Sequence, residues 1–122
     1  MRVSRFEDLL VWQKSINQSL LIYRYYAKNL DWGFKNQIQR ASVSIANNIA
    51  EGFDRSSDKE FKRFLFIALG SASEVRSMNY LGFKLNYISI EEFNECNNQL
   101  IEISKMLNGL SRSLNRNEVK YL

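Results

Sequence analysis

Not one proline occurs in the 122 residues of this chain, and only five glycines do. Proline breaks helices because it lacks a backbone N–H, and glycine weakens them because it is conformationally free. With so few breakers the chain can form long uninterrupted helices, and 45% of its residues are apolar. This length is that of one domain with one core. The composition therefore favours a single all-α domain over residues 1–122.

Apolar residues recur every three or four positions along four segments, which is the spacing of one helix face. In the last segment, Phe93, Cys96, Leu100 and Ile103 fall on such a stripe. We predict helices over residues 7–29, 32–52, 57–86 and 89–114, followed by a polar, basic tail over residues 115–122. Helices joined by short connections lie antiparallel to their neighbours, so the pattern predicts an up-down-up-down antiparallel four-helix bundle.

The residues at the segment boundaries support these helices. Asp31 is placed to cap the second helix, because a carboxylate there can accept hydrogen bonds from free backbone N–H groups. Ser57 with Glu60 and Ser89 with Glu92 fit the capping box. Gly52 is expected to end the second helix in a left-handed conformation.

Several classes of protein are disfavoured by what the sequence lacks. No stretch approaches the roughly 20 apolar residues that cross a bilayer, and charged residues interrupt the N-terminal apolar run where a signal peptide would need its core. The single cysteine, Cys96, cannot form an internal disulfide, and its place on an apolar stripe predicts a small core residue. We expect a cytoplasmic protein that does not enter membranes.

Histidine is absent, which removes the commonest general base and the commonest transition-metal ligand. The sequence also contains no glycine-rich phosphate loop, no metal-ligand spacing and no catalytic triad. We therefore predict a protein that is not an enzyme and has no catalytic residue, metal site, cofactor or small-molecule substrate. Hydrolysis by Glu51 or Glu74 is a weaker alternative.

A strip of polar side chains runs along the second helix and reaches the third. Arginine and carboxylates in such a strip favour a hydrogen-bonded network, buried or at an interface, that fixes the register of the helices. Acid–base chemistry is the alternative for the same groups. The predicted network consists of Arg40, Ser44, Asn47, Asn48, Glu51 and Glu74.

Helices two and three each carry a second apolar flank beside the core stripe. On helix two it comprises Val43, Ala46 and Ala50, and on helix three it includes Ile67 and Leu81. One bundle cannot hide both flanks and both stripes. We therefore expect contacts beyond the bundle and self-association, although the number of subunits stays open at this point.

Basic residues concentrate around the second connection and near the chain termini, and the net charge is +4. In an up-down-up-down bundle that connection lies at the same end as both termini, so these cations can converge and contact phosphate groups. Asp54, Asp58 and Glu60 lie among them, and an ordinary solvated surface is the alternative. The candidate nucleic-acid-binding residues are Arg2, Arg5, Arg55, Lys59, Lys62, Arg63, Arg112 and Arg116.

The segment QRASVSIANNIAEGFDR, followed by KEFKRFLFIALGSASE, resembles the signature of the four-helix-bundle family encoded by intervening sequences in bacterial 23S rRNA genes. FEDLLVWQKS resembles the start of that family. The resemblance implies a ring of bundles, a homopentamer, with suspected nucleic-acid binding and no established enzymatic activity. The fold is also similar to that of the accessory protein of diversity-generating retroelements. Ala46 departs from the family pattern, where proline is frequent, and so does Met78-Asn79, in a stretch that is usually less polar.

These observations lead to two hypotheses. The first is an oligomeric, non-enzymatic bundle that binds RNA or DNA mainly through phosphate contacts. The alternative is a structural scaffold, a ring that presents a surface to a protein partner. Salt-dependent binding to nucleic acid distinguishes the first from the second.

Overall fold

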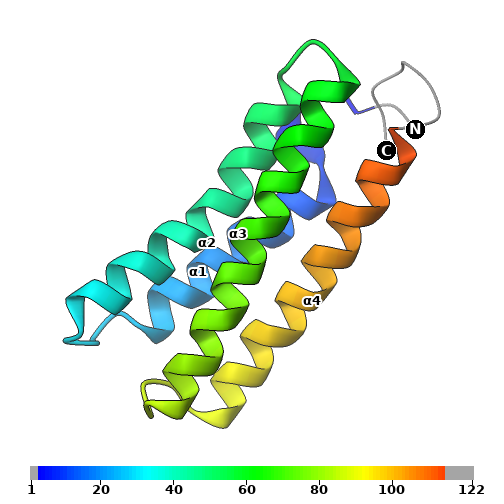
Figure 1. Ribbon diagram of the computed structural model, residues 1–122. Coiled ribbons are helices and arrows are strands. Elements are labelled where there is room, and N and C mark those ends of the chain that lie inside the picture. The colour runs from blue at the N-terminus through cyan, green and yellow to red at the C-terminus, as the bar shows by residue number, and fades with distance from the viewer. Residues whose placement is uncertain (1–2, 115–122) are drawn as a thin grey trace.

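Four helices run alternately up and down in the order of the chain (Figure 1). The structure is a computed structural model, and it describes residues 3–114. Within that range there is no strand, so the predicted all-α bundle is confirmed. The elements are a short 3-10 helix, η1, and four α-helices, with the bounds η1 Phe6–Asp8, α1 Leu10–Tyr25, α2 Trp32–Phe53, α3 Asp58–Lys84 and α4 Ile90–Ser113.

The first helix is shorter than the apolar periodicity suggests, at both ends. The chain forms η1 and passes through the extended, fully buried Leu9 before α1 begins. At the other end, Tyr26 leaves the helical conformation with φ −104° and ψ 8°. Its ring is buried and its hydroxyl donates to Asn79 Oδ1 at 3.0 Å. Tertiary contacts of these two side chains therefore set the ends of α1. The expected tail, 115–122, lies outside the described residues.

The predicted capping residues start their helices. Asp31 accepts a hydrogen bond from the Phe34 backbone N–H at 3.2 Å. Ser89 and Glu92 form the complete capping box, with bonds of 3.1 and 2.9 Å. Ser57 caps α3 through its hydroxyl. The carboxylate of Glu60 contacts Arg63, so this site is a simple cap.

Gly52 does not end α2, and the prediction of a left-handed cap there was wrong. Gly52 lies within the helix and is buried, and α2 ends at Phe53. A Cβ atom on Gly52 would lie 2.5 Å from Phe64 Cβ of α3. The glycine therefore serves the close approach of two helices. The left-handed residue is Asn86, with φ 63°.

Asn86 closes α3 with the pair of hydrogen bonds known as the Schellman motif. The Tyr87 N–H donates to the Gly82 carbonyl at 2.8 Å, and the Asn86 N–H donates to the Phe83 carbonyl at 3.0 Å. Asparagine tolerates this conformation better than most residues do.

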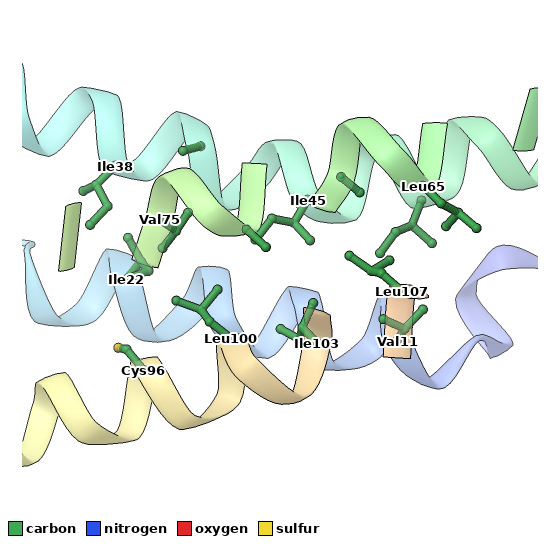
Figure 2. Packing of buried hydrophobic residues seen from close by; sticks show 14 of the residues in the cluster. Val11, Ile22, Ile38, Ile45, Leu65, Val75, Cys96, Leu100, Ile103 and Leu107 are labelled. Atoms are coloured by element: carbon green, nitrogen blue, oxygen red, sulfur yellow. The ribbon is translucent and has the colours of Figure 1, made fainter. Parts of the chain in front are cut away.

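The core is formed by apolar side chains that all four helices direct inward (Figure 2). Ile22, Ile45 and Leu100 are fully buried there. Cys96 is also fully buried, which confirms it as a core residue, and burial raises the pKa of its thiol to about 12. The pattern that predicted four helix faces therefore also identified the core.

The two extra apolar flanks have different environments. On α2, Ala46 is 1% exposed, and Ser19 of α1 donates to the Ser42 carbonyl at 3.0 Å. This side of α2 is thus partly covered by α1, but Val43 and Ala50 are only half-buried, so a contact of this flank beyond the bundle stays a prediction. On α3, Ile67 and Leu81 remain 40% and 50% exposed. The flank of α3 is the more open of the two. Over the described range, no helix is long and apolar enough to cross a membrane.

Candidate nucleic-acid interface

The connection between α2 and α3 lies at the same end of the bundle as η1 and the last turn of α4 (Figure 1). The up-down-up-down topology predicts this arrangement. Most of the candidate cations therefore belong to segments that meet at one end, which we call the basic end. Its described members are Arg5, Arg55, Lys59, Lys62, Arg63 and Arg112. Arg2 and Arg116 lie outside the described residues.

Two arginines of the basic end lie over the same aromatic ring. The guanidinium carbons of Arg55 and Arg63 are 4.9 and 4.7 Å from the centroid of the Phe64 ring. A cation over an aromatic face is attracted by the ring quadrupole, and the contact also orients the planar guanidinium. The side chains of Arg55 and Arg63 remain 45% and 57% exposed. Phe64 thus holds two cations in place while leaving them open to a ligand.

Sequence reasoning did not identify Phe64 as part of this site. Its position on the core stripe predicts a core residue, and it is indeed only 6% exposed. That Arg63 precedes Phe64 in the sequence only weakly indicates that Phe64 belongs to this site. The contact with Arg55 depends on the path of the connection between the helices, which periodicity does not specify.

The segments of the basic end carry as many carboxylates as described cations, namely Glu7, Asp8, Glu51, Asp54, Asp58 and Glu60. Glu51 Oε2 accepts from Arg55 at 2.8 Å, and Glu60 Oε1 lies 3.3 Å from Arg63. The hydrogen bond from Arg63 lowers the pKa of Glu60, so this carboxylate stays ionised. Arg5 lies 3.8 Å from Asp8. Exposed pairs of this kind contribute only about 0–1 kcal/mol each. A phosphate group can therefore compete with these carboxylates at little cost.

The other cations of this end differ in exposure. Lys59 and Arg112 are exposed, whereas Lys62 is half-buried. Lys59 follows the N-cap of α3 by two residues, and Arg112 lies in the last turn of α4. Both are free to reach a ligand that spans the end of the bundle.

Within one subunit Arg40, Glu51 and Glu74 do not pair with one another, so a network of these three residues at an interface between copies stays a prediction. Among residues 3–114, no ion pair joins Arg40 to either carboxylate. Glu51 pairs with Arg55, which lies four residues later and just past the end of α2, and Glu74 accepts from Gln37 at 3.2 Å. The two carboxylates are exposed and belong to separate contacts, so they offer no paired acid and base.

The uncharged part of the polar strip does join the two helices. Ser44 Oγ of α2 and Ser71 Oγ of α3 are 2.9 Å apart, and Asn48 Nδ2 donates to Ser44 Oγ at 2.9 Å. Arg40 and Glu74 border a polar hollow of about 530 Å³ beside these hydroxyls. Asn47 is exposed. The strip is thus a hydrogen-bonded seam with charges at its margin.

In the part of the chain that the structure describes, no group of three side chains is arranged to hold a metal ion. The described residues form a small all-α bundle in which two arginines lie over one aromatic ring at one end.

The chain belongs to the family described as 23S rRNA-intervening sequence protein, whose sequence model matches residues 7–109. The resemblance inferred from the motif of the second and third helices is thereby confirmed. A similar solved structure is a protein of unknown function from the S23 ribosomal protein family of Bacteroides thetaiotaomicron. It shares 29% sequence identity with a TM-score of 0.79, and the match covers 84% of this chain and 99% of that one. No curated protein matches the chain.

Proposed function

We propose that this protein is an oligomeric, non-enzymatic bundle that binds RNA or DNA mainly through phosphate groups. The observation that carries the proposal is the gathering of cations at the basic end, with Arg55 and Arg63 oriented over Phe64. Cations that contact phosphate bind nucleic acid with little dependence on base sequence. We expect no cofactor and no small-molecule substrate, and a cytoplasmic location.

The ion pairs of Arg55 and Arg63 with carboxylates can be replaced by contacts with phosphate groups. A guanidinium presents parallel N–H donors that match the oxygens of a phosphate as well as those of a carboxylate. Arg55 and Arg63 are already ordered by Phe64, so less side-chain entropy is lost when phosphate binds. Each subunit supplies only a few such contacts, and the affinity of one subunit is expected to be low.

Self-association would raise that affinity. The open flank of α3 carries Phe66, Ile67 and Leu81, which are 76%, 40% and 50% exposed. Exposed apolar side chains grouped on one helix are typical of a protein interface. We infer that copies of the chain associate through this flank, and five subunits is the number suggested by the resemblance to the intervening-sequence family. A closed ring repeats the basic end around its axis, so weak phosphate contacts add through avidity.

Binding of labelled RNA and DNA, measured by fluorescence anisotropy over about 50–200 mM salt, tests the proposal. Affinity should fall steeply with salt. The triple variant R55E/K59E/K62E should lose at least about tenfold in affinity. The matched control, K28E/K35E/K84E, makes the same charge change at the opposite end and should lose much less. Equal losses in both variants, or no binding at low salt, would overturn the proposal.

The mass of the protein in solution tests the association separately. Phe66→Glu should lower the mass towards that of one subunit, whereas Leu20→Glu, at a side chain 57% exposed on α1, should leave it unchanged. A wild-type protein that stays monomeric at high concentration would contradict the oligomer and the avidity derived from it.

A scaffold that binds a protein partner is the second candidate, and the exposure of Phe66 is the observation that favours it. Affinity capture with and without nuclease treatment distinguishes the two. A stoichiometric protein partner that survives nuclease treatment, together with absent nucleic-acid binding, would favour the scaffold.

A further inference from the structure

The guanidinium groups of Arg55 and Arg63 come from different elements but share one support. Both lie over the ring of Phe64, at 4.9 and 4.7 Å from its centroid. Arg55 precedes α3, and Arg63 lies within it. Phe64 is only 6% exposed and packs closely on Gly52 of α2, so the core holds its ring in place. The two guanidinium groups are therefore confined to the surroundings of one fixed ring, within reach of a single small anion.

The carboxylates that pair with these arginines can be replaced by a ligand. Nε and Nη2 of Arg63 are both 3.3 Å from oxygens of Glu60, whereas charge-assisted hydrogen bonds of this kind are usually about 2.7–2.9 Å long. The side chains of Glu60 and of Glu51, the partner of Arg55, are 40% and 55% exposed. Both carboxylates can turn into solvent when another anion approaches, and the two arginines can then bind that anion together.

The balance of charges at the basic end indicates which phosphate group suits the two arginines. The described segments of this end carry equal numbers of carboxylates and cations, so their summed charge attracts a singly charged phosphodiester only weakly. A phosphate monoester carries about −1.5 to −2 charges at pH 7 and presents three acceptor oxygens. Each guanidinium can donate two parallel N–H bonds to such a group. A doubly charged phosphate is therefore the better match for Arg55 and Arg63.

We propose that Arg55 and Arg63 together bind a terminal phosphate of a nucleic-acid strand, at its 5′ or its 3′ end. The inference rests on the proposed binding of nucleic acid and names the part of the strand that this site recognises. Lys59, which is exposed in the first turn of α3, remains available for internal phosphodiester groups. Phosphorylated ends should therefore be preferred over internal positions.

Fluorescence anisotropy with short strands of one sequence tests the proposal, with RNA and DNA measured side by side. The strands carry an internal fluorophore and differ only in having a 5′-phosphate, a 3′-phosphate or hydroxyl groups at both ends. A phosphorylated strand should bind at least about tenfold more tightly than the hydroxyl strand, as expected for one added charge-assisted hydrogen bond. The preferred end identifies the source of the phosphate. Inorganic phosphate should compete away the preference and leave the hydroxyl strand bound.

Arginine-to-lysine variants separate this contact from general attraction between charges. Arg55→Lys/Arg63→Lys keeps the net charge but loses the planar donors that match phosphate oxygens. This variant should lose most of the preference for the phosphorylated strand, while its affinity for the hydroxyl strand stays nearly the same. The matched control, Arg5→Lys/Arg112→Lys, changes two other arginines of the basic end and should keep the preference.

Three outcomes would contradict the inference. Equal affinities for phosphorylated and hydroxyl strands, both falling steeply with salt, would overturn it and leave the proposed function intact. An end preference that persists unchanged in Arg55→Lys/Arg63→Lys would overturn it as well, because another site would then bind the phosphate. If no strand binds at low salt, the proposed function fails, and this inference fails with it.

Discussion

Gly52 of α2 lies so close to Phe64 of α3 that a methyl group at position 52 would stand 2.5 Å from Phe64 Cβ. It would also stand 3.1 Å from Phe61 Cδ1. Phe64 Cβ is attached directly to the α3 backbone and Phe61 Cδ1 belongs to a buried ring, so the helices would have to separate. We expect Gly52→Ala to lower the free energy of unfolding by about 1–3 kcal/mol, measured by urea denaturation.

Gly70→Ala is the control for this prediction. No heavy atom lies within 4 Å of the Cβ position at Gly70, and the residue is exposed in the middle of α3. Alanine is a better helix former, so this variant should be about 0.5–1 kcal/mol more stable. If Gly52→Ala is as stable as the parent, the close approach of α2 and α3 is not what requires glycine.

Asn86, the residue with positive φ at the end of α3, provides a second prediction. A side chain with a Cβ strains the left-handed conformation, although asparagine tolerates it. Asn86→Ala should therefore lose about 1 kcal/mol of stability, and Asn86→Gly should be neutral or more stable. Thermal unfolding of the two variants measures the difference. A lower melting temperature for Asn86→Gly than for Asn86→Ala would be inconsistent with the Schellman motif.

The caps of α3 and α4 should differ in their contribution to stability. Ser89 and Glu92 satisfy two backbone N–H groups reciprocally, whereas Ser57 satisfies one. Ser89→Ala should cost about 1–2 kcal/mol and Ser57→Ala about 0.5–1 kcal/mol. Chemical denaturation of each variant tests this order of stability losses. Glu92→Ala removes one of the two bonds of the capping box and should therefore cost part of the stability that Ser89→Ala costs. A larger loss at Ser57 would contradict it.

The contact of Tyr87 with Asp31 should make stability depend on pH. The hydrogen bond from the Tyr87 hydroxyl, followed by the one from the Phe34 N–H, lowers the pKa of the Asp31 carboxyl. A lowered pKa in the folded state means that the stabilisation is present above the ordinary carboxyl pKa and is lost as the pH falls through the lowered value. Tyr87→Phe should raise the pKa of Asp31, as measured by NMR titration.

The same variant should therefore be less stable than the parent at neutral pH, and the difference should shrink in acid. Phenylalanine preserves the ring that contacts Phe34, so the comparison isolates the hydroxyl. A difference in stability that is unchanged between neutral and acidic pH would refute this assignment.

Cys96 should be unreactive in the folded protein. Burial raises the pKa of its thiol to about 12, so at pH 8 the thiolate required for reaction is scarce as well as inaccessible. A thiol reagent should modify Cys96 only as fast as the protein unfolds. Because the folded-state pKa is raised, the stabilisation is complete below the ordinary thiol pKa and is lost progressively as the pH rises from it towards 12. Rapid modification under native conditions would show that α4 opens locally.

The sequence predicts the bundle well because each helix buries one stripe, and periodicity reports burial directly. Asp31 and Ser89 were predictable for a similar reason, since capping involves residues only three positions apart. Gly52 was misassigned because glycine serves both helix ends and close contacts. Only the partner helix, with Phe64 at the point of approach, distinguishes these roles.

The candidate site was predictable in its location and less so in its contacts. Connectivity alone places Arg55 and Arg112 at one end of the bundle. Arg40 and Glu51 share a strip, yet Glu51 pairs with Arg55 just past the end of α2, because a partner four residues away is closer than one eleven residues away. The partner of a charged side chain depends on which alternative partner is nearest, and a helical projection does not give these distances.

Gln18 of α1 and Tyr26, which directly follows α1, contact two different helices. Gln18 Nε2 donates to Gln99 Oε1 and to the Cys96 carbonyl of α4 at 2.6 and 3.3 Å, whereas Tyr26 donates to Asn79 of α3. If α1 slid by one turn, these buried groups would face hydrocarbon, at a cost of about 1–3 kcal/mol for each stranded donor or acceptor. An interface made only of apolar side chains would tolerate such a shift of register. The hydrogen bonds of Gln18 and Tyr26 together fix one register of the first helix against its neighbours.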